Sequence, residues 1–268
     1  PHSQGYDRDP GSQKTNTEPT NLSKMFLLNG RSISPSAAGS TRWKIPFIES
    51  TILQTSSSVP PIALGITESW LKPYISDAQI SLQGYSVFRS DRPERVGGGC
   101  VLYIHDDIPI SFAHSFSDRE CSIVLAFSEA KNLLFSCIYR PPDCSQKSFL
   151  SILDVLQQQI NILSNNNLPD MFILGDFNLP LFNWDLGSPP PNSSPGCATL
   201  SEFIGDNFLT QVVNQPTRGS NILDLIFTNT PQNVASIGTE ATGISDHLLV
   251  ECLLTINPTA ASSSATTN

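Results

Sequence analysis

The most informative segment of this 268-residue chain is Met-Phe-Ile-Leu-Gly-Asp-Phe-Asn, residues 171–178. Its first four residues form a short apolar run of the kind that makes a buried strand. Gly175 permits a tight turn after that strand, which would place Asp176 and Asn178 on one side of the chain. A carboxylate and an amide placed together can orient a water molecule and contact a phosphate oxygen. The alternative is an ordinary turn, since Asp and Asn favour turns through local hydrogen bonds.

Similar apolar, β-branched runs recur between turn signals on both sides of this segment, and they predict many buried strands. The runs are residues 25–28, 62–66, 85–88, 100–104, 123–127, 133–139, 171–174, 223–227 and 248–256. Three helical patterns interrupt them. The clearest covers residues 146–163, where apolar side chains recur every three or four positions, and the others cover 198–207 and 45–53. This mixture predicts two packed sheets with helices outside them.

The chain has the pattern of one folded domain with polar ends. Residues 1–23 are polar and show no periodicity, and residues 258–268 are of low complexity, so we expect both to be disordered. Residues 24–257 contain no internal repeat, and the Pro-rich stretch 187–196 is more typical of a loop than of a domain boundary. Because the chain begins with Pro rather than Met, we expect it to be a piece of a longer polypeptide.

Composition narrows the classes of function. No apolar run approaches the roughly 20 residues that span a bilayer, so we expect no membrane partner. The net charge of −9 argues against a passive DNA-binding module and is compatible with an enzyme that gathers carboxylates around a metal. Six cysteines without CxxC spacing lie mostly in apolar runs, which favours buried free thiols over a disulfide framework.

Three further segments place charged side chains where apolar runs end or are interrupted. Glu68 follows the run 62–66, although a turn acid is the simpler interpretation of this residue alone. Asp224 stands within an apolar strand, and a buried carboxylate is costly unless it is paired. Asp246 and His247 open the last apolar run. Asp224 would pair with His247 and fix its imidazole, and Asp246 would be available to a hard cation.

Together these segments supply carboxylates, an amide and an Asp–His pair on several strands. Hydrolysis of a phosphodiester needs such groups: a hard cation to neutralise developing charge, an activated water and a cationic donor to the phosphate. The sequence therefore predicts the chemistry of a metal-dependent phosphodiesterase.

Seven short motifs follow one another along the chain: LNGRS from Leu28, ITESWL from Ile66, RSDR from Arg89 with GGG from Gly97, YRPP from Tyr139, GDFN from Gly175, LDLIFT from Leu223 and SDH from Ser245. Each motif is weak alone. In this order they resemble the endonuclease/exonuclease/phosphatase superfamily. More narrowly, the chain is similar to the apurinic-like endonuclease domain of LINE-type (non-LTR) retrotransposons.

The resemblance implies a four-layer α/β sandwich, with two packed mixed β-sheets flanked by helices, and a metal site at its centre. Glu68 matches the principal Mg²⁺ ligand of the family, with Asn29 close by and Asp246 as a further contributor. Mn²⁺ would substitute for Mg²⁺. The matching positions of Arg92 and Arg140 imply contacts with the substrate.

The resemblance also implies a role for each residue near the scissile phosphate. Asp176 would activate the attacking water, Asn178 would orient the phosphate, and Tyr139 would contact it. Asp224 and His247 match the family's Asp–His pair, with His247 facing the phosphate.

Two features bear on which branch of the superfamily the chain resembles. Arg31 stands where abasic-site repair enzymes carry an acidic residue, which favours the retroelement branch. The insertion 34–42 is unusual in composition and would alter the rim of the site.

The Gly97-Gly98-Gly99 run lacks the Lys and Ser/Thr of a phosphate-binding loop and precedes a strand, which indicates a turn.

The resemblance thus implies an endonuclease that nicks one strand of chromosomal DNA and leaves a 3′-hydroxyl to prime reverse transcription. The implied partners are DNA and a reverse transcriptase domain of the same polypeptide, and the implied location is the nucleus, after cytoplasmic synthesis. Two alternatives stay open. One is a phosphatase or phosphodiesterase acting on lipid or inositol phosphates, and the other is a decayed copy that binds partners without cutting.

Overall fold

Two six-stranded mixed sheets form the centre of the computed structural model, which describes residues 22–35, 44–50, 60–164, 167–184, 189 and 193–256. In order across the first sheet lie β11 (Val234–Glu240), β12 (Leu249–Leu254), β1 (Ser23–Asn29), β2 (Ala63–Thr67), β4 (Cys100–His105) and β3 (Tyr85–Ser90). In order across the second lie β5 (Phe112–Ser117), β6 (Ser122–Ser128), β7 (Leu133–Tyr139), β8 (Asp170–Asp176), β10 (Asp224–Thr228) and β9 (Thr210–Gln211). The predicted α/β class with two packed sheets is confirmed.

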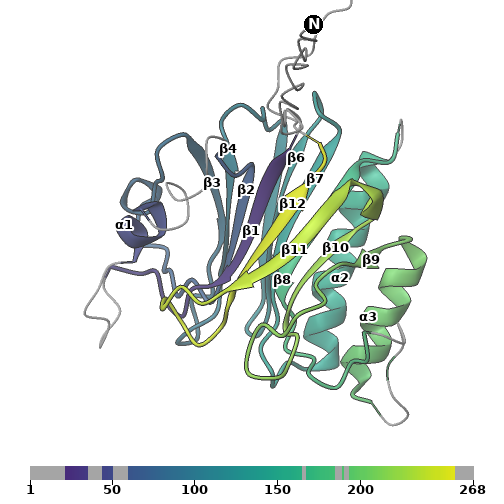
Figure 1. Ribbon diagram of the computed structural model, residues 1–268. Coiled ribbons are helices and arrows are strands. Elements are labelled where there is room, and N and C mark those ends of the chain that lie inside the picture. Colours follow the sequence, from purple (N-terminus) through teal and green to yellow (C-terminus); the bar gives the residue numbers. More distant parts are fainter. Residues whose placement is uncertain are drawn as a thin grey trace, which may run out of the picture.

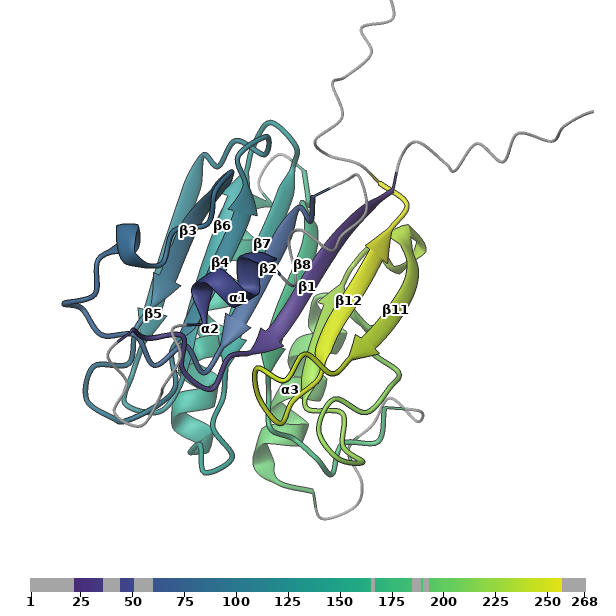
Figure 2. The same cartoon turned by 60° about the vertical axis from the view of Figure 1, so that its left-hand side comes forward.

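The helices lie outside the two sheets, which gives a four-layer sandwich (Figures 1 and 2). Helix α1 (Ile45–Ile48) covers the outer face of the first sheet, and α2 (Gln146–Leu163) and α3 (Pro195–Asp206) cover the outer face of the second. Two 3₁₀ turns are also present, η2 (Asp77–Gln79) and η3 (Pro231–Asn233). Among those residues, no helix combines the length and the apolar character needed to span a membrane.

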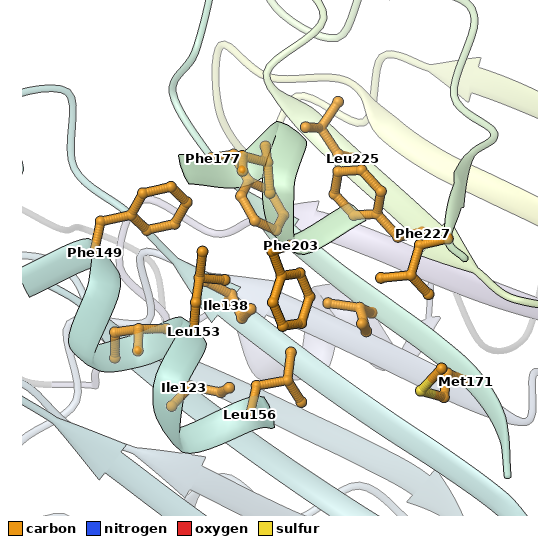
Figure 3. Packing of buried hydrophobic residues seen from close by; sticks show 14 of the residues in the cluster. Ile123, Ile138, Phe149, Leu153, Leu156, Met171, Phe177, Phe203, Leu225 and Phe227 are labelled. Carbon is orange, nitrogen blue, oxygen red and sulfur yellow. The ribbon is translucent and has the colours of Figure 1, made fainter. Parts of the chain in front are cut away.

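Three clusters of buried apolar side chains separate the layers. One lies between the sheets and includes Leu27, Phe135 and Leu174. Another joins α1 to the first sheet. The third packs α2 and α3 on the second sheet, and Figure 3 shows its aromatic centre, where Phe177 meets Phe149 and Phe227 edge to face. Burial of this apolar surface is the main stabilising contribution to the fold.

The predicted helix 146–163 is confirmed as α2, and Ser145 caps its start: Ser145 Oγ accepts a hydrogen bond from Ser148 N at 3.3 Å. The helix predicted over 198–207 begins earlier, at Pro195, because proline suits the first turn of a helix. Helix α1 confirms only the start of the prediction over 45–53, since residues 51–59 lie outside the described residues.

Three strands were not predicted from the sequence, namely β5, β9 and β11. All three lie at sheet edges, so much of their side-chain surface faces solvent and the apolar pattern is weak. The predicted disordered segment 1–23 ends one residue too late, because Ser23 already pairs with Leu254 in the sheet. Residues 1–21 of that segment and the predicted tail 258–268 lie outside the described residues.

Parallel pairing brings the ends of distant strands to one edge of the sandwich. Strand β1 runs parallel to β2, and β7 runs parallel to β8, while every other pair of neighbours is antiparallel. The last residues of β1 and β8 are Asn29 and Asp176, which hydrogen-bond to each other across the two sheets. The polar segments that end these strands therefore meet at one place.

Gly175 serves a different purpose from the tight turn that the sequence suggested. It lies within β8, and a Cβ atom there would collide with the backbone oxygen of Ile138 on β7. Its lack of a side chain allows the two strands to approach closely just before Asp176. Gly175 therefore helps to place the polar end of β8.

We predict that Gly175→Ala lowers the free energy of unfolding by about 1–3 kcal/mol, the usual cost of overpacking a core. Urea unfolding measures the change. The matched control is Gly205→Ala, in α3, where an added Cβ meets nothing within 4 Å. That variant should gain about 0.4–1 kcal/mol because alanine restricts the unfolded chain. Equal stability of the two variants would contradict the close approach described for Gly175.

Candidate active site

Asp176 occupies the centre of the site and is 1% exposed. Its Oδ2 accepts a hydrogen bond from Asn29 Nδ2 at 2.9 Å, and its Oδ1 accepts one from the backbone N of Asn178 at 3.1 Å. The second contact is the local turn that the sequence offered as an alternative. The structure therefore contains both features that the sequence offered as alternatives: the local turn and a polar site around Asp176. Asn178 Nδ2 in turn donates to the backbone oxygen of Arg140 at 2.9 Å, which fixes the amide.

Asp224 and His247 form the expected pair. Asp224 Oδ2 lies 2.7 Å from His247 Nδ1, and the two side chains are 0% and 3% exposed. The contact fixes the ring orientation and leaves Nε2 as the nitrogen that is available to a substrate. His247 is also held through its backbone N, which donates to Ser245 Oγ at 3.1 Å.

Thr217 holds this pair in place and was not identified from the sequence. Its Oγ1 accepts hydrogen bonds from the backbone N atoms of Leu223 and Asp224 at 3.0 and 3.1 Å. Its backbone oxygen accepts from Leu248 N at 2.7 Å. Thr217 is fully buried, so one loop residue joins the start of β10 to the residue after His247. A threonine in a polar loop carries no signal that would single it out in a sequence.

The register of the second sheet places Asp224 directly opposite Asp176 on neighbouring antiparallel strands. Burial, and then the Asp224 and Glu68 carboxylates, raise the pKa of Asp176 well above its usual range, against hydrogen bonds from Asn29 and Asn178 that lower it. The second oxygen of Asp224, Oδ1, is buried without a hydrogen-bond partner among the described residues. The site therefore holds more negative charge and more acceptor capacity than its own side chains satisfy.

Glu68 is held by the glycine-rich turn that precedes β4. Its Oε2 accepts from Gly98 N at 2.8 Å and from Trp70 Nε1, so both donors fix the carboxylate at the end of β2. Glu68 and Trp70 have positive φ angles of 53° and 57°, a costly conformation for residues with a side chain. Gly97, Gly98 and Gly99 also have positive φ, and this agrees with the expected turn rather than a phosphate-binding loop.

Tyr139 ends β7 beside Asp176, with which it is paired in register. Burial raises the pKa of the Tyr139 phenol, and the Glu68 carboxylate, which hydrogen-bonds to it, and Asp176 raise it further. The phenol therefore stays protonated and acts as a donor toward the acidic centre of the site.

The structure buries both arginines that were expected to contact the substrate. Arg92 donates to backbone oxygens of Gly97, Val96 and Glu120 and lies over the Tyr139 ring, 5.5 Å from its centroid. Its guanidinium is therefore engaged in holding the glycine turn.

Arg140 likewise donates to the backbone oxygens of Pro141, Phe177 and Asn178 at 3.1–3.3 Å. It is 5% exposed. In this structure neither Arg92 nor Arg140 presents its charge at the surface, which differs from the expectation of direct substrate contact and indicates a positioning role.

Asp246, expected near the metal, lines the same cavity and contacts two arginines. Its Oδ1 accepts from Arg31 at 2.8 Å and its Oδ2 from Arg218, 2.9 Å from Nε and 2.7 Å from the second guanidinium nitrogen. Partial burial alone would raise the pKa of Asp246, but the hydrogen bonds from Arg218 and Arg31 lower it. Both guanidiniums remain about half exposed. Arg218 was not identified from the sequence, because it lies in the same irregular loop as Thr217, where no pattern of residues singles it out.

Part of this set of side chains lines one cavity of about 200 Å³ at the edge of the sandwich. The lining residues are Asn29, Arg31, Glu68, Trp70, Pro142, Asp176, Asn178, Arg218, Asp246 and His247. Five of the seven non-glycine residues with positive φ in the described chain line this cavity or border it: Arg31, Ser32, Glu68, Trp70 and Asn178. Such strained positions persist where the surrounding structure enforces them, which is typical of functional sites.

The buried acidic and histidine cluster beside this cavity, formed by Asp176, Asp224 and His247, suits hydrolysis of a phosphoester bond. A sequence model described as the endonuclease/exonuclease/phosphatase family matches residues 49–247. The chain belongs to this family. No match was found among curated proteins.

Solved structures share the fold at low sequence identity. The AP endonuclease LMAP of Leishmania major has a TM-score of 0.61 at 12% identity, covering 91% of this chain and 90% of its own. A mannosyl-6-phosphatase of Bacteroides thetaiotaomicron has a TM-score of 0.57 at 15% identity, covering 87% and 99%. The endonuclease domain of TRAS1, a telomere-specific non-LTR retrotransposon, has a TM-score of 0.55 at 12% identity, covering 87% and 98%.

The residues present fit a divalent cation, which the family implies. Asp176, Asp224 and His247 each offer a ligand atom, and the three atoms lie within 4.8 Å of one another. His247 Nδ1 is already engaged by Asp224, and hard cations such as Mg²⁺ prefer oxygen ligands. The unpartnered Asp224 Oδ1 and the carboxylates of Asp176 and Glu68 are therefore the groups best suited to hold it.

We predict that saturating Mg²⁺ raises the melting temperature, because a cation relieves the repulsion between Asp176 and Asp224. At about 100 times the dissociation constant, binding contributes about 2.7 kcal/mol, or roughly 5–10 °C for a domain of this size. Differential scanning fluorimetry with and without chelator measures the shift. It should vanish in Asp176→Asn and persist in Asp154→Asn, which removes an exposed acid on α2. A full shift in Asp176→Asn would place the cation elsewhere.

Proposed function

We propose that this chain is an Mg²⁺-dependent DNA endonuclease that nicks one strand and leaves a 3′-hydroxyl for reverse transcription of a retroelement. The observation that carries the proposal is the convergence of Asp176, Asn178 and His247 on one cavity, with Asp224 behind His247 and the half-exposed guanidiniums of Arg31 and Arg218 at its rim. Anionic groups below and cationic groups above suit a phosphate that enters from the surface.

The floor of the cavity supplies the groups for hydrolysis. Asp176, held by Asn29, is placed to orient and deprotonate a water molecule. His247, held by Asp224, donates a hydrogen bond from Nε2 to a phosphate oxygen, and the protonated phenol of Tyr139 is a second hydrogen-bond donor. A bound divalent cation supplies electrostatic stabilisation of the charge that develops on the phosphate.

The rim favours a polymeric substrate over a small, enclosed one. Arg31 and Arg218 are about half exposed, and each is paired with Asp246 only in a surface ion pair, which contributes about 0–1 kcal/mol. Either guanidinium can therefore leave Asp246 for a phosphate at little cost. Two guanidiniums on one rim suit successive phosphates of a strand, and this supports DNA over lipid or inositol phosphates.

The sequence motifs carry the finer part of the proposal, since the family also contains phosphatases and the fold alone does not choose among substrates. The retroelement-type segments YRPP and LDLIFT, and Arg31 at the position acidic in repair enzymes, support a retroelement endonuclease. A reverse transcriptase domain of the same polypeptide is the proposed partner, and the nucleus the proposed location. The net charge of −9 suggests that other domains hold the protein on DNA.

We predict that the purified chain converts supercoiled plasmid to open circles in Mg²⁺, and that a DNA polymerase extends the nicks without phosphatase treatment. Asp176→Ala and His247→Ala should each reduce the nicking rate at least about 100-fold, as expected for loss of a general base or acid. Asp154→Asn is the control and should nick normally.

A substrate panel separates this proposal from the other activities of the family. The same preparations are offered inositol phosphates and sugar phosphates, and phosphate release is measured. Rapid release from these esters without plasmid nicking would overturn the proposed substrate. Nicking that survives both alanine variants would overturn the proposed site.

We further predict that Asp246→Asn changes DNA binding more than metal binding, because Asp246 pairs with two guanidiniums that a phosphate would otherwise engage. Its KM for DNA should fall a few-fold, since neither guanidinium then has to leave a carboxylate, while the Mg²⁺ concentration for half-maximal activity stays within about twofold. Arg31→Ala and Arg218→Ala should each lower the salt-dependence slope of binding by about one. Glu68→Gln is the contrasting variant, with a raised Mg²⁺ requirement. A tenfold higher Mg²⁺ requirement in Asp246→Asn would show that Asp246 is a metal ligand after all.

A further inference from the structure

Two cysteines outside the proposed catalytic chemistry lie within reach of each other. Cys121 Sγ, just before β6, lies 2.9 Å from Cys144 Sγ, in the loop between β7 and α2. All six cysteines of the chain are among the described residues, and all are free thiols. Five of them are buried, and Cys144 alone is partly exposed. A reagent in solution therefore reaches Cys144 before any other thiol of the folded protein.

The backbone around both thiols is held by hydrogen bonds, so their proximity follows from fixed structure. Asp118 Oδ1 accepts from the backbone N of Cys121 at 2.7 Å. Glu120 Oε2 accepts from the backbone N of Ser145 at 2.6 Å, and Ser145 caps α2. These contacts join the segment before β6 to the segment after Cys144. The two sulfurs are thus presented to each other by elements that are already linked.

A disulfide needs little further movement. Its sulfurs lie about 2.05 Å apart, so the pair needs to approach by only about 1 Å, which small side-chain rotations provide. The other candidate pair is Cys100 and Cys137, both fully buried between the sheets, where no oxidant reaches them. Proximity therefore selects Cys121 and Cys144, and accessibility selects Cys144 as the member of that pair that a reagent reaches first.

The electrostatic surroundings favour Cys144 as the thiol that reacts first. The hydrogen bond from Cys121 and the charge of Arg140 lower the pKa of Cys144, against burial, which raises it. The hydrogen bond to Cys144 and then burial raise the pKa of Cys121. The thiolate is the nucleophilic form of cysteine, so Cys144 is the thiol that attacks and Cys121 is the thiol that reacts second.

We propose that Cys121 and Cys144 form a modification site for small disulfides, at which Cys144 is attacked first and Cys121 resolves the adduct into an intramolecular disulfide. Cys144 thiolate attacks one sulfur of glutathione disulfide, forms a mixed disulfide and releases one glutathione thiolate. Cys121 sulfur then attacks the Cys144 sulfur and displaces the second glutathione, which takes the Cys121 proton. The two protein thiols lose two electrons in total, and the small disulfide gains them.

The disulfide would stabilise a loop that borders the active site. Cys144 lies in the loop that begins at Arg140, and the backbone oxygen of Arg140 accepts the hydrogen bond that fixes Asn178. Pro142, in the same loop, lines the cavity. A crosslink between residues 23 apart in sequence restricts the unfolded chain and stabilises the folded one. We expect the oxidised protein to melt roughly 5–10 °C higher than the reduced protein.

The test is oxidation of the full chain with glutathione disulfide, followed by alkylation of the remaining thiols and peptide mass spectrometry. The expected product has two fewer alkylatable thiols and a peptide crosslink between Cys121 and Cys144. Cys121→Ala should stop the reaction at a glutathione adduct on Cys144, and Cys144→Ser should give neither adduct nor crosslink. Cys197→Ser, at a buried cysteine outside the pair, is the control and should form the crosslink normally.

Two results would overturn the proposal. One is a persistent glutathione adduct on Cys144 of the unmodified chain, because Cys121 then fails to resolve it. The other is no reaction at either residue in protein that melts cooperatively. Since the readout is thiol chemistry, neither result depends on whether the chain cuts DNA.

Discussion

Asp176 and Asp224 face each other on neighbouring antiparallel strands, and both are buried. Like charges in directly opposite positions of a sheet are destabilising, and burial increases the cost of each charge. The surrounding structure offsets this cost group by group. Asn29 and the backbone of Asn178 donate to Asp176, and His247 engages one oxygen of Asp224. One acceptor, Asp224 Oδ1, is left without a partner among the described residues, and this is the physical reason to place a cation there.

Several contacts of the fold hold these two buried carboxylates close together. Strands β1 and β8 belong to different sheets, yet the hydrogen bond between Asn29 and Asp176 joins their ends. Gly175 allows β8 to approach β7 closely, and Thr217 ties the start of β10 to the start of β12. The two sheets provide a rigid frame, and backbone strain is gathered in the loops at one edge, where Glu68 and Asn178 have positive φ. A stable core thus supports a costly arrangement of charges.

The features that could be predicted from the sequence are those that depend on burial. A carboxylate inside an apolar strand needs a partner, and for this reason Asp224 could be paired with His247 from the residue pattern alone. The strands of the sheet interiors were predicted on the same basis, whereas the exposed edges β5 and β11 were not. The ion pairs of Asp246 could not be predicted, because Arg31 lies 215 residues away in sequence and Arg218 in an irregular loop. Nor could Gly175 be assigned its true purpose, since the collision it avoids is with another strand.

A divalent cation between the buried carboxylates at the edge of the sandwich is the centre of the proposed chemistry. The most direct measurement is anomalous scattering from crystals of the protein grown with Mn²⁺. We expect one strong peak at bonding distance, about 2.0–2.3 Å, from carboxylate oxygens among Asp176, Asp224 and Glu68. A cavity without a peak at saturating Mn²⁺, or a cation bound only to Asp246 and surface acids, would contradict this placement.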